Sequence, residues 1–290
     1  MSIDFRSRAL RYGVTVASTA TQTPQTVLVT GATSGIGAEV ARQMVQRGHR
    51  VFGTSRRPDS VANPIPGVTY VRLDNADYAS AQQCADAVGD VDILINNAGE
   101  SQAGALEDTP MSAIEDLFRV NVFGPIALTK AVLPGMRERR RGTVVMVGSM
   151  LASFPTAFRS DYAATKAALK AFALAARREV APFGVRMISV EPGTIATGIG
   201  GRRSIHIGEN SPYRGEYEIL AAATRRNEDA GIDAATMARV IVDAALAESP
   251  KPFYAKGNNA GIVFLMRRLL PRQFILDMTA RKHGLRRIKP

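Results

Sequence analysis

The chain has 290 residues, of which 46% are hydrophobic and 22% charged, a composition typical of a globular protein and not of a disordered or fibrous one. Its single cysteine, Cys84, excludes an internal disulfide, its first 25 residues carry no apolar signal segment, and no apolar window approaches the ~18 residues of a membrane helix, so we expect a cytoplasmic protein. Most of the net charge of +11 lies in residues 256–290, which contain nine Lys and Arg and a single acid, Asp277. The rest of the chain is close to neutral, which does not fit a nucleic-acid-binding fold.

In chain order, residues 1–25 are predicted to form a flexible arm, after which short apolar runs alternate with longer stretches of helical period. Most of the runs are apolar on both faces, as strands are when helices cover both sides of a sheet. Strands are predicted at 26–30, 50–54, 69–73, 91–96, 143–147, 185–190 and 252–255. Helices are predicted at 36–48, 79–88, 112–133, 161–181 and 234–246. This alternation predicts an α/β fold, a doubly wound, mostly parallel, seven-stranded sheet with helices on both faces.

The sheet is predicted to form a single domain over residues 26–258. Within it, residues 198–231 are rich in Gly, Arg, Ser and Glu and interrupt the alternation of strands and helices. We expect an irregular substrate loop there, because a long irregular stretch in a compact domain is usually functional. Residues 259–290 are predicted to form a basic helical extension.

A glycine-rich turn, TGATSGIG at 30–37, follows the first predicted strand and precedes a helix. Glycines let backbone amides approach a pyrophosphate closely, and the helix N-terminus adds partial positive charge. The spacing is G-x-x-x-G-x-G, and a plain tight turn is the alternative interpretation. The position after the first strand favours a dinucleotide site. The expected cofactor-binding residues here are Gly31, Thr33, Ser34, Gly35, Ile36 and Gly37.

The end of the second predicted strand carries Ser55, Arg56 and Arg57, with no acid before Asp59. Domains that bind NAD place an acid there for the ribose 2′-OH, whereas those that bind NADP place a cation for the 2′-phosphate. A guanidinium can hold a phosphate through two hydrogen bonds. The pattern therefore predicts NADP, with two solvated loop arginines as the alternative.

Further motifs follow in an order and spacing that resemble the short-chain dehydrogenases/reductases, over about 26–258. They are Asp74, Asn96-Asn97-Ala98-Gly99, Asn121, Ser149, Tyr162-x-x-x-Lys166 and Pro192-Gly193-Thr194-Ile195-Ala196-Thr197. The resemblance implies a Rossmann-type fold and a nicotinamide-dependent oxidoreductase. In layout, the C-terminal extension resembles that of the branch with hydroxysteroid and retinol dehydrogenases.

The chemistry can also be read from three of these residues. Tyr162 and Lys166 are four positions apart and hence neighbours on one face of a helix. An ammonium near a phenol favours the phenolate form, so Tyr162 is the expected acid and base that gives a proton to a carbonyl oxygen or takes one from an alcohol. Ser149, after the fifth predicted strand, can hydrogen-bond the same oxygen.

The resemblance implies the remaining roles. Lys166 would also hold the nicotinamide ribose, and Asn121 would support a water that relays protons. Asp74 would contact the adenine, Asn97 the ribose side, and Ile195 and Thr197 the carboxamide. Ala98, Gly99, Pro192 and Gly193 complete the expected cofactor site. Taken singly, Ser149 could simply end a strand, and Asn121 could be buried for a backbone hydrogen bond.

Substrate identity is less visible in the sequence. Met150, Leu151, Phe154 and Phe158 are expected to line an apolar pocket, although such residues are just as often plain core. The segment Gly261–Met278 mixes bulky apolar residues with arginines around Pro271. Three interpretations compete for it, which are a lid over the pocket, a helix docked on its own domain, and a contact with a membrane or a partner.

The first hypothesis is an NADP(H)-dependent enzyme that interconverts an alcohol and a ketone or aldehyde on a lipophilic substrate. The alternatives are a non-catalytic NADP(H)-binding regulator and a lipid-binding protein acting at a membrane surface through its basic tail. No metal is implied, because His49, His206 and His283 form no ligand-spaced cluster. The resemblance further implies a homodimer or homotetramer paired through the helices predicted at 112–133 and 161–181.

Overall fold

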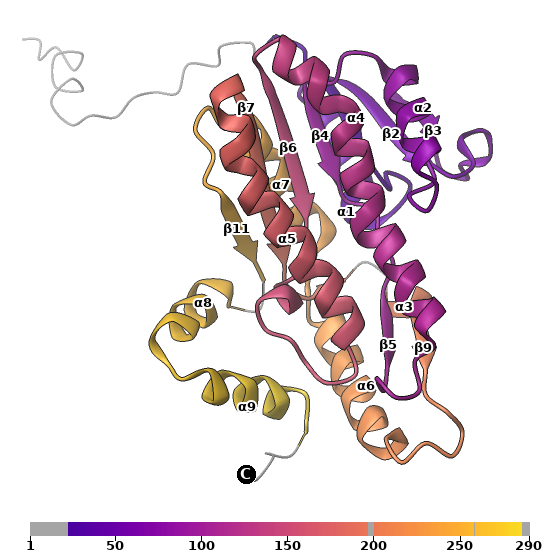
Figure 1. Ribbon diagram of the computed structural model, residues 1–290, viewed down its shortest axis with the longest axis vertical. Helices are drawn as coiled ribbons and strands as arrows, with labels where there is room; N and C mark the ends of the chain where they lie inside the picture. The colour runs from indigo at the N-terminus through magenta and orange to yellow at the C-terminus, as the bar shows by residue number, and fades with distance from the viewer. Residues whose placement is uncertain (1–22, 197–199, 258, 286–290) are drawn as a thin grey trace, which may run out of the picture.

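Seven parallel strands form the centre of the protein in a computed structural model that describes residues 23–196, 200–257 and 259–285 (Figure 1). Their order across the sheet is β11-β7-β6-β4-β1-β2-β3, and each neighbouring pair is parallel. The strands are β1 (Thr26–Val29), β2 (Arg50–Ser55), β3 (Val68–Arg72), β4 (Ile93–Asn96), β6 (Gly142–Val147), β7 (Val185–Pro192) and β11 (Phe253–Lys256). The predicted sheet and fold class are confirmed.

Helices cover both faces of this sheet (Figure 1). They are α1 (Gly35–Gln46), α2 (Tyr78–Val88), α4 (Gly124–Glu138), α5 (Ser160–Val180) and α7 (Ala234–Leu246), whereas α3 (Met111–Phe118) contributes to neither core. A π-helical turn, Arg119–Phe123, joins α3 to α4. The stretch predicted as one helix over 112–133 therefore runs as a continuous helical segment with one irregular turn.

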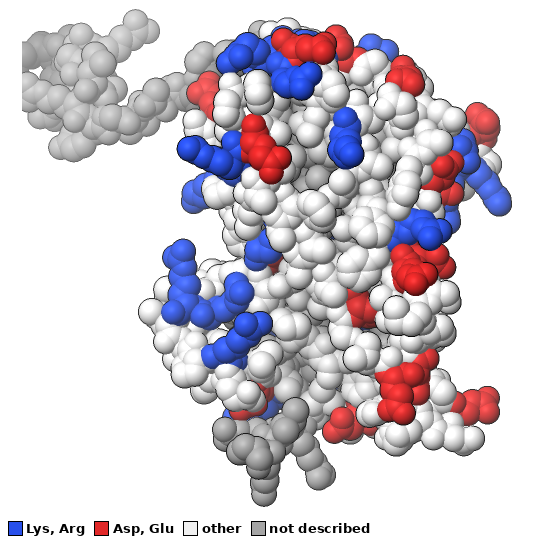
Figure 2. Space-filling view, in the orientation of Figure 1, with Lys and Arg blue, Asp and Glu red and all other residues white. Residues whose placement is uncertain are grey.

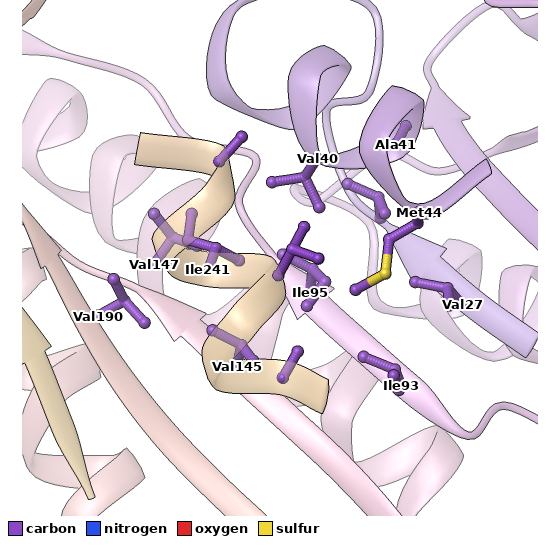
Figure 3. Close-up of a cluster of buried hydrophobic side chains, with 14 of the residues drawn as sticks. Val27, Val40, Ala41, Met44, Ile93, Ile95, Val145, Val147, Val190 and Ile241 are labelled. Carbon is purple, nitrogen blue, oxygen red and sulfur yellow. The ribbon is translucent and has the colours of Figure 1, made fainter. Parts of the chain in front are cut away.

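Successive side chains of the central strands enter two different cores, because strand side chains alternate between faces. On β1, Val27 and Val29 pack in the core shared with α1 and α7, whereas Leu28 packs in the core shared with α2, α4 and α5. All three are fully buried. Figure 3 shows the first core, where Met44 of α1 and Ile241 of α7 lie against the strands. Burial on both faces explains why these strands read as continuous apolar runs.

The direction of strand addition reverses beside β1, which pairs with β2 on one side and with β4 on the other. In a doubly wound sheet this reversal opens a crevice at the carboxyl ends of the strands, which is where such folds bind ligands. The glycine-rich turn after β1 and the Asn-Asn-Ala-Gly segment after β4 both lie at this edge.

The expectation of an irregular segment over 198–231 is wrong for much of its length. A helix, α6 (Arg214–Asp229), occupies it, and a short strand, β9 (Ser204–His206), pairs with β5 (Gln102–Gly104). Only Leu220 and Ala223 of α6 are buried. The many exposed polar side chains of this helix therefore dominated the composition and concealed its apolar face. Two further short strands, β8 (Ile195–Ala196) and β10 (Ile232–Asp233), also pair.

Two C-terminal helices, α8 (Ala260–Leu269) and α9 (Arg272–Lys282), follow the last strand and are separated at Pro271. They pack on the sheet end through a small core that includes Met150, Phe154 and Ile275. Phe264 of α8 meets the Phe154 ring edge-on, with 5.0 Å between ring centroids. The predicted arm, 1–25, falls almost entirely outside the described residues.

Candidate active site

The glycine-rich turn has a backbone that suits a phosphate. Gly31 and Gly35 adopt positive φ values of 66° and 56°, which side chains rarely tolerate. A Cβ at Gly37 would stand 2.4 Å from the Gly31 carbonyl oxygen, so the turn closes too tightly for any side chain there. Helix α1 begins at Gly35 with no side-chain hydrogen bond from its N-cap, Ser34, and no acid in its first turn. Its first amides can therefore receive an anion.

Two threonines that the sequence reasoning missed hold this turn in place. The Thr30 hydroxyl oxygen accepts hydrogen bonds from the backbone N–H groups of Asn97 and Ala98, each at 2.9 Å. The Asn97 side-chain amide donates to the Thr30 carbonyl oxygen at 3.0 Å, and the Gly31 N–H donates to the Thr54 hydroxyl at 3.2 Å. These bonds join the ends of β1, β2 and β4. Their only sequence signal is a threonine at the end of a predicted strand.

The residues expected to select the cofactor lie at the end of β2. Arg56 and Arg57 are exposed, and neither forms an ion pair with another described residue. The Ser55 hydroxyl accepts a hydrogen bond from the Arg57 N–H at 3.1 Å. Asp74, after β3, is half-buried and accepts a hydrogen bond from the Ala76 N–H at 3.0 Å. Two guanidinium groups are thus available to an anion at this end of the crevice.

Tyr162, Lys166 and Ser149 line one cavity of roughly 410 Å³ at the same edge of the sheet. Tyr162 and Lys166 are only 9% and 5% exposed, and the Lys166 ammonium lies 5.8 Å from the centroid of the Tyr162 ring. That ammonium donates a hydrogen bond to the Val147 carbonyl oxygen at 3.2 Å. The Ser149 hydroxyl oxygen accepts from the Leu151 N–H at 3.2 Å, and its proton can point elsewhere. The three groups thus lie around one cavity, with Lys166 beside the Tyr162 ring.

Asn121 sits in the π-helical turn and is fully buried. Its side-chain oxygen accepts from the Glu100 N–H at 2.8 Å, and its amide donates to the Glu100 carbonyl at 2.9 Å and to the Thr165 hydroxyl at 3.3 Å. A Cβ at Gly99 would stand 3.0 Å from this oxygen and 3.4 Å from the Lys166 nitrogen. Asn121 therefore fixes the segment after β4 beside Lys166, and its relay role stays a prediction.

A sequence pattern described as short chain dehydrogenase matches residues 25–206. The chain belongs to this family. It is 31% identical over 239 residues to a 3-ketodihydrosphingosine reductase of Bacteroides thetaiotaomicron, which covers 80% of this chain and 87% of the relative. It is 35% identical over 191 residues to human retinol dehydrogenase 8, which covers 62% of this chain and 61% of that protein. A crystal structure of a short-chain dehydrogenase from Streptomyces avermitilis superposes with a TM-score of 0.74 at 37% identity, over 86% of this chain and 93% of that one.

The short-chain dehydrogenase fold brings part of the predicted cofactor set into the same cavity. Ile36, Asn97, Gly99, Pro192, Gly193 and Ile195 line it together with the three catalytic candidates. The other predicted residues do not line this cavity. Asn121 lies in the π-helical turn, and the rest follow the carboxyl ends of β1, β2, β3 and β4: Gly31, Thr33, Ser34, Gly35, Gly37, Ser55, Arg56, Arg57, Asp74 and Ala98. Thr197 lies outside the described residues. The turn, its helix N-terminus and this line of residues fit a dinucleotide.

One wall of the cavity beyond the catalytic candidates is apolar, and α8 and α9 form part of it. Met150, Leu151, Phe154, Val263 and Met278 line it. The C-terminal helices therefore cover the pocket and at the same time dock on their own domain, so two of the three interpretations of this segment describe one arrangement. Phe158, also expected in the lining, packs instead against Tyr217 of α6, with 5.8 Å between ring centroids.

The sequence reasoning also missed a cationic end of this cavity. Arg159, just before α5, is 6% exposed, and its guanidinium carbon lies 4.6 Å from the Tyr162 ring centroid. Burial, and then repulsion by Arg203, lowers the pKa of Arg159 to about 10. No sequence signal marks Arg159, because a single arginine near Tyr162 carries no recognisable spacing. Among the described residues, no group of His, Cys, Asp or Glu could hold a metal ion.

Proposed function

We propose that this protein is an NADP(H)-dependent oxidoreductase that interconverts an alcohol and a ketone or aldehyde on a lipophilic substrate. One observation carries the proposal: Ser149, Tyr162 and Lys166 share a cavity with the cofactor-side residues Gly193 and Ile195. Apolar side chains, among them Met150, Phe154 and Val263, form one wall of the same cavity, which suits a hydrophobic substrate.

When bound, a nicotinamide supplies or accepts the hydride at the substrate carbon. The chain's own residues handle the oxygen and its proton. In the reductive direction Tyr162 donates its hydroxyl proton to the carbonyl oxygen, and in the oxidative direction it takes the proton back from the alcohol. The Lys166 ammonium places a positive charge beside the Tyr162 ring. The Ser149 hydroxyl donates a hydrogen bond to the same oxygen as negative charge develops on it.

The exposed pair Arg56 and Arg57 supports NADP over NAD. A 2′-phosphate carries the charge that two unpaired guanidinium groups attract, and Arg can hold it through two parallel hydrogen bonds. Ser55, at the end of β2, offers a hydroxyl beside them.

A panel of steroids, retinoids, fatty aldehydes and small ketones tests the proposal through NADPH oxidation. Tyr162→Phe should bind NADPH as the wild type does and lose turnover by about 10²-fold or more, since it removes the proton donor. A protein that binds NADPH and turns over nothing in the panel would favour the non-catalytic regulator. Turnover that survives in Tyr162→Phe would contradict the assignment of the acid.

We also propose that the protein forms a homodimer or homotetramer through α4 and α5. Phe123, Phe172 and Leu174 on or beside these helices are 46%, 48% and 39% exposed, and few charged side chains lie over α5 (Figure 2). An exposed apolar area of this kind usually marks an interface. A monomeric mass in light scattering would contradict the proposal.

The outer side of α8 favours peripheral contact with an anionic membrane from the cytoplasm. Ile262, Leu265 and Leu269 fall on one side of the helix and are 63%, 56% and 73% exposed, and Lys and Arg gather over α8 and α9 (Figure 2). Apolar side chains flanked by cations bind anionic lipid surfaces. No described helix is long and apolar enough to cross a bilayer. Co-sedimentation with anionic and neutral liposomes, with and without residues 256–290, tests this contact, and equal sedimentation of both proteins would refute it.

A further inference from the structure

Arg159 is a buried cation that forms no ion pair, although the nearby carboxylates of Glu228 and Asp161 oppose the fall in its pKa. Its guanidinium donates one hydrogen bond, from Nη2 to the Ser101 hydroxyl at 2.9 Å, and its Nε is buried with no hydrogen-bond partner among the described residues. No carboxylate of the described chain forms an ion pair with it. A buried charge without a partner is costly, so a site that retains one usually receives a counter-charge from elsewhere.

A second arginine faces the same point. Arg203, on the segment before β9, donates from Nε to the same Ser101 hydroxyl at 3.2 Å, so that two guanidinium groups converge on one small side chain. Arg203 also pairs with Glu228 of α6. Asp161, which is near Arg159 in sequence, is engaged by the Gln102 side chain and by the Tyr162 N–H. Asp161 and Glu228 thus offset part of the Arg159 charge without a direct ion pair, while their own hydrogen bonds go to other groups.

The charges around the cavity leave an excess of cations. Its lining contains four positive side chains, Arg159, Lys166, Arg203 and Lys282, and two carboxylates, Glu100 and Glu228. His283 also lines the cavity, but burial lowers its pKa, which favours the neutral imidazole. Lys166 belongs to the catalytic set. The remaining excess lies around Arg159, where α5, α6 and α9 contribute to the wall.

We propose that the substrate of this cavity is a lipophilic carboxylate, whose acid group binds Arg159 and Arg203 while its carbonyl or alcohol group reaches Tyr162. The proposal rests on the oxidoreductase function above and specifies its substrate class. The guanidinium of Arg159 lies against the Tyr162 ring, so the acid group and the reacting carbon would be parts of one molecule. The apolar wall of Met150, Phe154 and Val263 would hold the hydrocarbon portion.

The cofactor's own phosphates do not account for this cationic end. The backbone that fits a pyrophosphate is the turn at 30–37, and the candidate cations for a 2′-phosphate are Arg56 and Arg57 at the end of β2. None of those cations lines the cavity, whereas Arg159 and Arg203 both do. The unpaired Nε of Arg159 is thus left for another anion.

Calorimetric binding of decanoate and of decanamide, which has the same chain and no charge, tests the proposal directly. With saturating NADP⁺ and again without it, the wild type should bind one decanoate per chain about tenfold or more tightly than decanamide, as expected for charge-assisted hydrogen bonds to arginine. Arg159→Gln should reduce that ratio to about twofold or less, and Arg159→Lys to an intermediate value, since lysine keeps the charge and loses the planar fork. Arg226→Gln, an exposed arginine of α6 outside the cavity, should leave the ratio unchanged.

A wild-type ratio near one overturns the proposal, whether or not the variants fold. A preference for decanoate that persists in folded Arg159→Gln also overturns it, because the preference then comes from other cations.

Turnover separates this inference from the function on which it rests. The matched pair is 4-oxodecanoate and its methyl ester, assayed for NADPH oxidation. Their acid or ester group is close to the carbonyl, as the 4.6 Å between the Arg159 guanidinium and the Tyr162 ring centroid requires. If kcat/KM for the acid exceeds that for the ester about tenfold or more and Arg159→Gln removes the difference, the oxidoreductase proposal and the acid preference both stand. If both compounds are reduced equally, only the acid preference fails. If decanoate binds through Arg159 and no carbonyl compound is reduced, the anion site stands and the oxidoreductase proposal fails. If Arg159→Gln slows acid and ester alike, Arg159 positions Tyr162 and binds no substrate acid.

Discussion

The buried ion pair between Glu191 and Lys170 gives a quantitative prediction for Lys170→Met. Glu191, near the end of β7, has no exposed surface, and the Lys170 ammonium of α5 lies 2.8 Å from its Oε1. Lys170 also donates to the Ser153 hydroxyl at 2.6 Å, which in turn donates to Glu191 Oε2 at 2.8 Å. The network ties β7 and α5 to the turn that follows Ser149. Methionine keeps much of the lysine volume and leaves the carboxylate without its counter-charge.

The expected loss of unfolding free energy at pH 8 is about 3 kcal/mol, the lower end of the range for removing one partner of a buried ion pair. We take the lower end because the Lys170 side chain is 19% exposed. Protonation of Glu191 limits the loss at acidic pH. With an ordinary glutamate pKa of about 4.3 and about 1.4 kcal/mol for each pH unit, neutralising this carboxyl at pH 5 costs only about 1 kcal/mol.

The sign of the pH dependence follows from the pKa of Glu191. Burial raises this pKa, and Lys170 and Ser153 oppose the rise. Between the unfolded and the raised folded pKa, the native state binds more protons than the unfolded state, so stability is present below this window and falls as pH rises through it. Removing Lys170 raises the folded pKa of Glu191 further. Lys170→Met should therefore lose stability more steeply than the wild type between pH 5 and pH 8.

Urea denaturation followed by far-UV circular dichroism at pH 5, 6.5 and 8 measures the effect, since the chain has no tryptophan. The matched control is the double variant Lys170→Met, Glu191→Gln, which removes both charges. It should recover about half or more of the loss at pH 8, because the uncompensated charge causes most of the damage. A loss that is equal at pH 5 and pH 8, or a double variant as unstable as the single one, would refute the reasoning.

Three further predictions concern other parts of the molecule. Arg56→Ala should raise the Kd for NADPH about tenfold or more and that for NADH less than about twofold; equal effects on both would remove the NADP assignment. Gly37→Ala, whose Cβ would stand 2.4 Å from the Gly31 carbonyl oxygen, should abolish NADPH binding in a fluorescence titration and lower the melting temperature, whereas Gly215→Ala, with open space around its Cβ, should do neither. Burial raises the pKa of the Cys84 thiol to about 11, so a thiol reagent at pH 8 should react only as fast as the protein opens, and rapid labelling of the native protein would contradict this burial.

Local sequence was enough to predict the sheet and its cofactor edge. Strands such as β1 and β4 are buried on both faces, so three of the four residues in each are apolar, and this leaves a signal within four positions. The glycine-rich turn is also local, because its tight closure depends on neighbouring positive φ values. The spacing of Tyr162 and Lys166 follows from the helical repeat alone.

Tertiary packing decided the features that depend on residues far apart in the chain. Arg159 and Arg203 both donate hydrogen bonds to Ser101. These three residues come from separate segments of the chain, and none of them belongs to a recognisable sequence pattern. Helix α6 was concealed because only a narrow stripe of it is buried. The position of α8 beside the pocket depends on the contact between Phe264 and Phe154, which no local periodicity encodes. Sequence alone therefore determined the backbone scaffold and the spacing of Tyr162 and Lys166, whereas the charge and shape of the cavity arise only where distant segments pack together.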